Sequence, residues 1–409
     1  MKAWVLHGIN DIRFETKEKP ALAPGEVLVN VKAAGICGSD IPRIYKTGAH
    51  VHPLVPGHEF SGTVAAAGQG ADPGWLGKRV GVFPLIPCGL CGPCLAGQYE
   101  MCRNYGYLGS RRDGGFGEYV AVPAENLIEL PDSVSFEEAA MLEPMAVAVH
   151  AMRRVLGDAS CPVNVPAREA AGENLRGDQA RAEGVLAPGG EDRGQRTSHT
   201  ARQTVPAAAT DDAIIVVWGL GTIGLLLTAL LQERSQSVGK SGDSENRILV
   251  IGNKDFQRQK ILELGLPAQA YCDTRTQDGR QWIMERTGGH GADVIFECVG
   301  RNETVRRAVD SAAAAGKICL VGNPASDMTL EKEVYWKILR NQLTLTGTWN
   351  SSFTHAGSDD WHYALDRLSH RDIMAEQLIS HRLPLESLEK GLCIMRDKSE
   401  DYIKMMAVI

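Results

Sequence analysis

A glycine-rich turn limits the possible folds of this chain more than any other feature. Residues 219–224 have the sequence GLGTIG, and the apolar run at 213–217 directly before them is predicted to be a strand. In a strand–turn–helix unit Gly219 permits the tight turn, Gly221 lets the backbone approach a pyrophosphate, and Gly224 allows the helix to pack closely on the strand. The N-terminus of that helix would face the phosphates. We therefore predict that a dinucleotide binds at Gly219, Gly221, Thr222, Ile223 and Gly224.

The segments around this turn alternate between apolar strands and helices. Strands are predicted at 213–217, 247–251, 292–298 and 317–321, and helices at 222–231 and 257–264. Strands separated by helices form βαβ units and a parallel sheet. The first part of the chain differs, because short β-branched runs alternate there with Gly and Pro. Such runs lie at 26–34, 61–67 and 79–83. The predicted fold class is α/β, with a β-rich domain and a doubly wound parallel-sheet domain.

The length of 409 residues suits two domains joined by a further segment. The stretch 159–212 contains no Phe, Trp, Tyr or Ile, so it cannot bury enough apolar surface to offset chain entropy. We expect a long surface insertion or linker there and a smaller polar insertion at 235–246. The predicted segments are a catalytic domain at 1–157, an insertion at 158–212, a nucleotide-binding domain at 213–348, and a helical C-terminal part at 349–409 that packs back on the first domain.

Charge and hydropathy exclude two classes of partner. The net charge of −7 gives no basic face for nucleic acid. Residues 213–231 carry no charge over about the length of a membrane span. Their three glycines and the strand–turn–helix pattern explain the same apolarity without a membrane. The first ten residues lack the basic start and the long apolar core of a signal peptide. We therefore expect a cytoplasmic protein that binds neither nucleic acid nor membrane.

Four cysteines lie close together in a segment that also contains three glycines. They are Cys88, Cys91, Cys94 and Cys102. In a long cytosolic chain, cysteines at such spacing more often hold a metal than form disulfides. Four thiolates can complete a tetrahedral shell around Zn²⁺ and leave no position for substrate. An iron–sulfur cluster uses the same number of cysteines, so the spacing alone leaves both open. We predict a structural zinc.

A second group of metal-binding residue types is dispersed along the first domain. Cys37 lies in GICGSD, His58 and Glu59 lie in PGHEFSG, and Glu143 lies in LEPMAVAVH. One thiolate, one imidazole and one carboxylate can hold zinc with an exchangeable position for water or substrate. Taken singly, each residue has an ordinary structural interpretation. Together they predict a catalytic zinc site.

The order of these motifs resembles that of the zinc-containing medium-chain alcohol dehydrogenases. CGSD, GHEFSG, the four-cysteine segment, DGGFGEY, the LEP glutamate and GLGTIG cover nearly the whole chain apart from the two insertions. The resemblance implies a GroES-like β-rich catalytic domain, a Rossmann domain, and hydride transfer between a secondary alcohol and NAD(P). It places the catalytic zinc on Cys37, His58 and Glu143, with Glu59 as a direct or alternate ligand. It places the structural zinc on Cys88, Cys91, Cys94 and Cys102.

Within that family, three stretches are most similar to enzymes that act on sugar-alcohol phosphates such as galactitol 1-phosphate. They have the sequences CGSDIPRIYKTGAH, GSRRDGGFGEY and KILRNQLTLTGTW. Guanidinium groups match phosphate oxygens in bidentate fashion, so basic residues in these stretches are candidates for binding the substrate. The candidates are Arg111, Arg112, Arg43 and Lys46. The alternative is a solvated basic turn without a ligand.

Two residues near Cys37 bear on proton transfer. Ser39 is the candidate for receiving the alcohol proton by a hydrogen bond, and its alternative role is that of a turn serine. Many polyol dehydrogenases of this family carry a histidine five residues after the zinc cysteine. This chain has Pro42 there, which can accept no proton. We therefore expect water or another group to complete the transfer.

The identity of the cofactor depends on the end of the second strand. NAD-specific sites usually carry an acid there that binds the ribose 2′-hydroxyl. Matching the strand at 247–251 to the family places Gly252 at that position, followed by Asn253 and Lys254. The missing acid and the nearby lysine favour NADP, whereas the closest resemblance implies NAD. Asp255 is expected to begin the next helix.

Other functions remain open from the sequence alone. An unphosphorylated-polyol dehydrogenase of the sorbitol or iditol type, or a threonine-type dehydrogenase, would share the zinc and nucleotide motifs. A metal-stabilised structural or redox-sensing protein could keep the fold without the activity. That last hypothesis predicts that the catalytic ligands are lost, and this chain retains Cys37, His58 and Glu143. The family resemblance further implies a homodimer or homotetramer.

Overall fold

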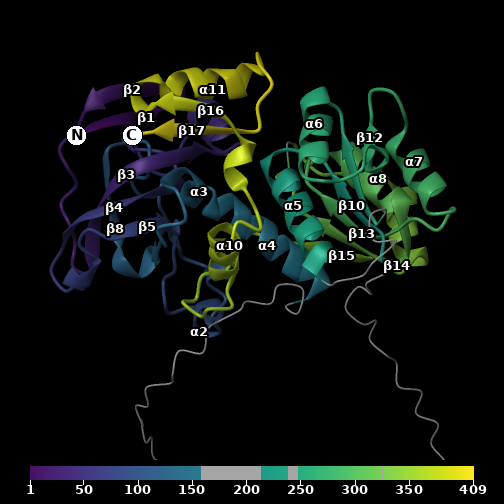
Figure 1. Ribbon diagram of the computed structural model, residues 1–409, viewed down its shortest axis with the longest axis horizontal. Coiled ribbons are helices and arrows are strands. Elements are labelled where there is room, and N and C mark those ends of the chain that lie inside the picture. The colour runs from purple at the N-terminus through teal and green to yellow at the C-terminus, as the bar shows by residue number, and fades with distance from the viewer. Residues whose placement is uncertain (158–212, 238–246, 325) are drawn as a thin grey trace, which may run out of the picture. The chain divides into compact units, whose positions relative to one another are not determined.

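The computed structural model describes residues 1–157, 213–237, 247–324 and 326–409 (Figure 1). The predicted insertion at 158–212 and most of the smaller one at 235–246 lie outside the described residues. Residues 235–237 end a helix of the nucleotide-binding domain. All described residues belong to one compact unit, so the predicted domain boundaries stay predictions.

The nucleotide-binding part contains a six-stranded, wholly parallel sheet. Its strands are β10 (Ile215–Trp218), β11 (Ile248–Gly252), β12 (Tyr271–Asp273), β13 (Ala292–Glu297), β14 (Ala312–Leu320) and β15 (Thr344–Gly347). Its helices are α5 (Thr222–Ser237), α6 (Asp255–Glu263), α7 (Gly279–Arg286), α8 (Asn302–Ser311) and α9 (Lys332–Arg340). The strand order β12-β11-β10-β13-β14-β15 reverses direction between β10 and β13, where ligands bind in doubly wound sheets. The predicted fold class is confirmed.

Alternate residues of this sheet belong to two different cores. Val217 packs in one core with α4 (Leu142–Leu156) and α5, whereas Val216 and Trp218 pack in the other with α7, α8 and α9. A sheet covered by helices on both faces needs such continuous apolar strands, and this explains why 213–217 contains no polar residue. The uncharged stretch that matches a membrane span in length is therefore divided between β10 and α5.

The glycine turn joins these two elements as the sequence predicts. A Cβ at Gly224 would lie 1.9 Å from the carbonyl oxygen of Gly219, so only glycine lets α5 begin this close to β10. The helix then starts at Thr222 with its N-terminus beside the turn. This places free backbone N–H groups where phosphates would bind.

The catalytic part is mainly β. Its strands are β1 (Lys2–Gly8), β2 (Asp11–Thr16), β3 (Glu26–Ile36), β4 (Glu59–Ala67), β5 (Arg79–Val82), β6 (Leu85–Ile86), β7 (Gly106–Tyr107), β8 (Tyr119–Pro123) and β9 (Leu127–Glu129). Its helices are α1 (Asp40–Pro42), α2 (Gly92–Leu95), α3 (Phe136–Ala140) and α4 (Leu142–Leu156). A seven-stranded sheet forms around β3, which pairs with β4, β8 and β17. The three strands predicted here are confirmed.

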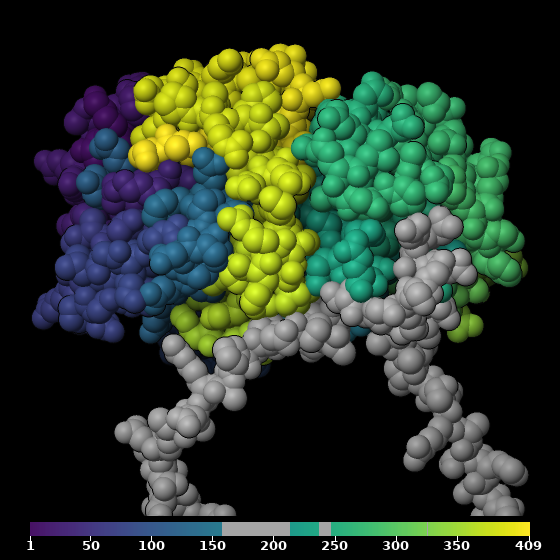
Figure 2. All heavy atoms as spheres, in the orientation of Figure 1, coloured from purple at the N-terminus to yellow at the C-terminus, as the bar shows by residue number. Residues whose placement is uncertain are grey.

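The C-terminal part differs from the prediction, because it contributes strands as well as helices. It contains α10 (Asp360–Ser369), β16 (Ile379–Pro384), α11 (Leu388–Asp397) and β17 (Lys404–Val408). β17 pairs antiparallel with β3, so this segment does return to the first domain. It also contacts the second domain, since Arg367 of α10 donates to Glu233 of α5 at 3.0 Å. Figure 2 shows this segment, in yellow, against both parts.

Candidate active site

The four cysteines of residues 88–102 come together around one point. Their Sγ atoms all lie within 4.8 Å of one another, and the Sγ atoms of Cys91 and Cys94 are 3.5 Å apart. The short helix α2 begins directly after Cys91 and carries Cys94 on its inner side. The backbone N–H of Cys88 donates to the Sγ of Cys102 at 3.2 Å. This donor set fits a tetrahedral ion with four sulfur ligands.

The electrostatics of this lobe differ from one cysteine to the next. Hydrogen bonds from the backbone N–H groups of Arg103 and Cys94 lower the pKa of Cys91 to about 6. Burial raises the pKa of Cys94 to about 12. One thiolate therefore forms readily, whereas another needs a cation to lose its proton. A zinc ion held by the four cysteines would supply that cation, because a coordinating thiol is deprotonated.

The dispersed residues of the second group are brought together by strand pairing. Cys37 follows β3, and His58 and Glu59 lie where β4 begins. The two strands are antiparallel neighbours, with Gly35 opposite Glu59. Ligand atoms of Cys37, His58 and Glu59 lie within 4.8 Å of one another. Glu143 stands outside this group of three, although it lines the same cavity.

Sequence analysis missed a buried lysine in this cluster. Lys404 of β17 places its Nζ 2.8 Å from a carboxylate oxygen of Glu59, and both side chains are buried. The same Nζ donates to the carbonyl oxygen of Ile36 at 3.3 Å. The pairing of β17 with β3 brings this lysine to a carboxylate 345 positions earlier. Glu59 is thus neutralised by Lys404, which leaves Glu143 as the carboxylate without a lysine partner.

A second missed residue, Asp40, connects the proposed ligands. Its carboxylate accepts a hydrogen bond from the backbone N–H of Cys37 at 3.0 Å and is paired with Arg43. Oδ1 of Asp40, the oxygen that Arg43 contacts, also lies 3.4 Å from Nδ1 of His58, and this buried nitrogen makes no hydrogen bond. A carboxylate beside one ring nitrogen orients the imidazole so that the other nitrogen can bind a metal. The residues present therefore fit a zinc ion.

Glu143 lies near the start of α4 and is bound by a tyrosine. The hydroxyl of Tyr107 donates to an oxygen of Glu143 at 3.3 Å. Burial raises the pKa of Glu143 to about 7, the charge of His58 opposes that shift, and Glu59 adds to it. A divalent cation in the cluster would favour the ionised carboxylate. Tyr107 is a third residue that sequence analysis missed.

The cluster opens into a cavity of about 550 Å³ lined by residues of both domains. Ser39, Pro42 and Arg43 line it beside Cys37, and Ile223 lines it from α5. The four predicted phosphate ligands lie in different places. The guanidinium of Arg111 stacks over the ring of Tyr105 at 4.7 Å, and Tyr105 lines the cavity. Of the four, only Arg43 lines the cavity itself. Arg112 pairs with the buried Glu26, and Lys46 is exposed.

A second cavity, of about 900 Å³, surrounds the glycine turn. Gly219 and Gly221 line it, together with Asn253 from the end of β11. The other predicted contacts have different roles here. Thr222 donates its hydroxyl to the carbonyl oxygen of Ile403 at 2.7 Å, and the Nζ of Lys254 is 2.8 Å from Asp401. Neither side chain lines this cavity.

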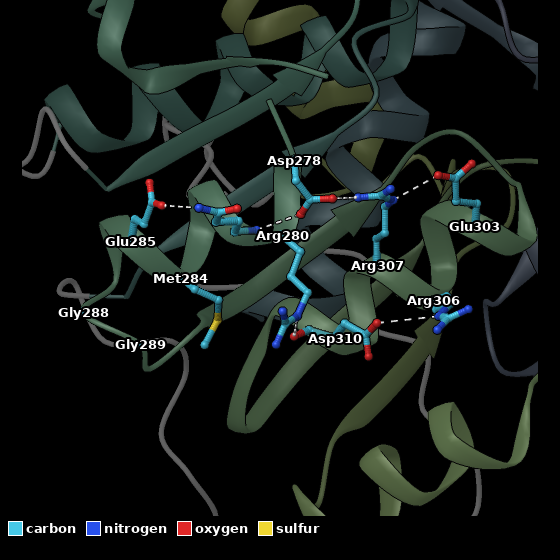
Figure 3. A pocket seen from close by; sticks show the side chains of 11 residues that line it. Asp278, Arg280, Met284, Glu285, Gly288, Gly289, Glu303, Arg306, Arg307 and Asp310 are labelled. Atoms are coloured by element: carbon cyan, nitrogen blue, oxygen red, sulfur yellow. Dashed lines mark hydrogen bonds and ion pairs between the residues drawn. The ribbon is translucent and has the colours of Figure 1, made fainter. Parts of the chain in front are cut away.

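A third cavity, of about 990 Å³, lies between α7 and α8, and no cysteine or histidine lines it. Several of its charged side chains are paired with one another, as Figure 3 shows. Arg307 contacts Asp278 and Glu303, and Arg306 is 3.8 Å from Asp310. Such exposed ion pairs are typical of a solvated surface. We therefore do not place the chemistry there.

Within the described part of the chain, no helix combines the length and the apolarity that crossing a membrane requires.

Comparison with known proteins agrees with this geometry. The chain matches the family model for the alcohol dehydrogenase GroES-like domain at residues 23–132 and that for zinc-binding dehydrogenases at residues 244–370. It is 30% identical over 368 residues to galactitol 1-phosphate 5-dehydrogenase of Escherichia coli K12, covering 90% of this chain and 88% of that protein. It is 27% identical over 412 aligned positions to sorbitol dehydrogenase of Halalkalibacterium halodurans, covering 99% and 98%. The crystal structure of galactitol-1-phosphate dehydrogenase from Escherichia coli superimposes with a TM-score of 0.77 at 28% identity, covering both chains in full. The chain therefore belongs to the zinc-containing alcohol dehydrogenases and is an NAD(P)-dependent enzyme of that family.

Proposed function

We propose that this enzyme moves a hydride between a secondary alcohol of a sugar-alcohol phosphate, similar to galactitol 1-phosphate, and NAD(P). The observation that supports a phosphorylated substrate is that three basic side chains lie at or beside the cavity next to Cys37. The relative at 30% identity acts on galactitol 1-phosphate by name, which supports the same class.

In this proposal Cys37, His58 and Glu143 hold the catalytic zinc, and Glu59 is the alternate carboxylate. The zinc would polarise the substrate oxygen and lower the pKa of the alcohol. Lys404 keeps Glu59 paired and so favours Glu143 as the resting ligand. The structural zinc is held by Cys88, Cys91, Cys94 and Cys102.

Residues that line the cavity receive the alcohol proton and position the nicotinamide that exchanges the hydride. Ser39 lines the cavity two residues after Cys37, so its Oγ can accept the alcohol proton while its own hydroxyl proton passes to water. Pro42 also lines the cavity, and proline cannot accept a proton. A proton relay through this position is therefore absent, and water takes up the proton instead. Ile223 lines the substrate cavity from the helix that follows the glycine turn. A dinucleotide bound at that turn would therefore present its nicotinamide to the same cavity.

The phosphate would bind where Arg43, His50 and Arg111 approach one another. Arg43 and His50 line the cavity, and Arg111 stacks over Tyr105 beside it. Partial burial lowers the pKa of His50, and the charges of Arg111 and Arg43 lower it further, so these groups lie close together. The Nε of Arg111 is buried without a hydrogen-bond partner. Like charges held together in this way favour an anionic ligand.

Initial rates with galactitol 1-phosphate and with galactitol test the substrate class. We expect a higher kcat/KM for the phosphorylated polyol. Arg111→Ala should lower kcat/KM for galactitol 1-phosphate about 10- to 100-fold and leave galactitol unchanged, because a hydrogen bond to a charged group is lost. Lys46→Ala is the matched control, since this cation is exposed and outside the cavity. Equal or better turnover of galactitol would instead support the sorbitol-type alternative.

We also propose that the enzyme is a homodimer or homotetramer. Tyr335, Trp336 and Leu339 of α9 are about half exposed. β15, which follows α9 in the chain, is an edge strand of the six-stranded sheet. Exposed apolar side chains and an uncovered strand edge are both typical of subunit contacts. Light scattering should give two or four chains per particle, and Trp336→Glu should reduce that number. The expected cytoplasmic location stays a prediction.

A further inference from the structure

The strand end that usually contacts the adenosine ribose is closely covered by two side chains in this protein. β11 ends at Gly252, where an acidic residue would bind the ribose 2′-hydroxyl in an NAD site. A Cβ at Gly252 would lie 2.6 Å from Oε1 of Gln257 and 2.9 Å from the ring of Tyr271. A side chain at this position would have to displace the ends of Gln257 and Tyr271, so their packing disfavours the acid.

Those neighbours are fixed by their own hydrogen bonds. Oε1 of Gln257 accepts from the backbone N–H of Asn253 at 3.0 Å, and its Nε2 donates to the carbonyl oxygen of Leu220 at 3.0 Å. The hydroxyl of Tyr271 donates to the carbonyl oxygen of Lys254 at 3.1 Å. The space beside the strand end is thus filled by uncharged groups. Selectivity at this position must come from another residue.

The loop after β12 brings a guanidinium to this strand end. The backbone N–H of Thr274 donates to the carbonyl oxygen of Gly252 at 2.9 Å, which holds the loop against β11. The next residue, Arg275, lines the nucleotide cavity. Its Nε donates to Asp273 at 3.0 Å and its Nη1 to Asp255 at 3.3 Å. Neither aspartate lines the cavity, so the carboxylates hold the guanidinium from outside.

The charge around the cavity favours an anion-rich ligand. Four cationic side chains line it, namely Arg275, Arg301, Arg307 and Lys398. Two acids do so, Asp278 and Glu303, and both of these are already bound to Arg307. Asp255, which pairs with Arg275 from outside the cavity, has a side chain that is 88% exposed. An ion pair this exposed is weak, so a phosphate dianion can replace it.

We propose that Arg275 is the residue that selects NADP(H), by binding the 2′-phosphate of the cofactor. Asp273 keeps the guanidinium oriented, and the phosphate takes the place of Asp255. A guanidinium near the strand end accommodates a 2′-phosphate in this type of fold, whereas an acid there favours NAD. The proposal rests on the dinucleotide site of the proposed function, and it assigns the role that the sequence suggested for Lys254 to a different cation.

Calorimetric titration of the full-length protein with 2′,5′-ADP and with 5′-AMP tests this assignment without turnover. We expect 2′,5′-ADP to bind more tightly than 5′-AMP. Arg275→Gln should weaken binding of 2′,5′-ADP about 10- to 100-fold and leave 5′-AMP unchanged, since only the contact to the extra phosphate is lost. Arg275→Lys should be intermediate, because the charge remains while the bidentate fork is lost. Retained 5′-AMP affinity shows that each variant is folded.

Lys254→Ala is the matched control, because this lysine neighbours the same strand end but is paired with Asp401 outside the cavity. It should leave both affinities unchanged. Equal binding of the two nucleotides by the unaltered protein would overturn the proposal. A loss confined to Lys254→Ala would overturn it as well and would restore the assignment made from the sequence. Failure of the dehydrogenase assays with tight 2′,5′-ADP binding intact would instead count against the proposed polyol substrate alone.

Discussion

The two clusters of metal-binding residues are built in opposite ways. The cysteine lobe comes from fifteen consecutive residues, 88–102, and its ligands are held by local turns and backbone N–H groups. The cluster around Cys37 takes its residues from the end of β3, the start of β4, α4 and β17, and most of its charged side chains are buried. The first offers a metal four sulfur atoms, and the second offers sulfur, nitrogen and oxygen atoms.

This difference indicates that the cysteine lobe contributes to stability and that the cluster around Cys37 contributes to catalysis. A closed set of four thiolates leaves no position for a substrate, so its ion can only hold the lobe together. The mixed cluster opens into a cavity and is surrounded by Asp40, Lys404 and Tyr107, which adjust the orientation and charge of its ligands. If the comparison is right, damage to one cluster should reduce turnover and damage to the other should reduce stability.

The largest effect should follow from His58→Ala. Removing this ligand should lower the zinc content from two ions per chain to one and reduce kcat/KM about a thousandfold or more, because metal polarisation of the substrate contributes several kcal/mol. Metal analysis and initial rates measure both. The melting temperature should stay within a few degrees of the unaltered protein, by the usual effect of about 1 kcal/mol for a single substitution.

His290→Ala is the matched control for that variant. His290 is exposed and lies in a loop before β13, outside every cavity described above. Zinc content and rate should both be unchanged. A thousandfold loss of rate with two zinc ions still bound would show that His58 acts by another route. The assignment of the cluster around Cys37 as a zinc site would then be wrong.

Cys94→Ser should have a smaller effect, of a different kind. Loss of one of four ligands should release the structural zinc and lower the free energy of unfolding by about 3 kcal/mol, since binding to a structural site contributes directly to folding. Chemical denaturation measures this change. The kcat of the folded fraction should stay within a factor of two or so, as expected for a site that performs no catalysis.

Cys319→Ala controls for the loss of a buried cysteine that binds no metal. Cys319 is fully buried in β14, so its replacement should cost packing energy but leave two zinc ions bound. If Cys94→Ser abolished turnover without lowering stability, the assignment of the lobe as structural would be wrong.

The same contrast decides what the sequence could predict. The cysteine lobe was recognisable because its ligands are neighbours in the chain, and spacing alone implies a four-sulfur shell. The cluster around Cys37 required family resemblance, because strand pairing creates it. Lys404 could not be foreseen, since its partner Glu59 is 345 positions away. Arg275 escaped notice for a similar reason, since it approaches Gly252 only through the pairing of β11 with β12.

The missed strands of the C-terminal part have a physical explanation as well. In β17 the residues Lys404 to Ala407 are all buried, so the strand lacks the alternation that indicates a sheet with one solvated face. A lysine at its start also breaks the apolar run. The carboxylate of Glu59 and the carbonyl oxygen of Ile36 make that buried charge tolerable. The arginines of GSRRDG show the same limit, because Arg111 faces a cavity-lining tyrosine whereas Arg112 turns to Glu26.

Asp40→Asn should give the smallest effect and the sharpest test of the comparison. The substitution keeps the size of a fully buried side chain but removes the negative charge beside His58 and Cys37. Residues that orient metal ligands typically contribute about 10- to 100-fold to metal affinity or activity, so catalytic zinc should be lost to a chelator at correspondingly lower chelator concentration. The cysteine lobe lies outside the contacts of Asp40, and its zinc should be released at the same chelator concentration as before. A two-phase chelator titration followed by metal analysis separates the two ions. If both phases shifted equally, the clusters would be coupled through the fold, and the division into a structural and a catalytic site would have to be abandoned.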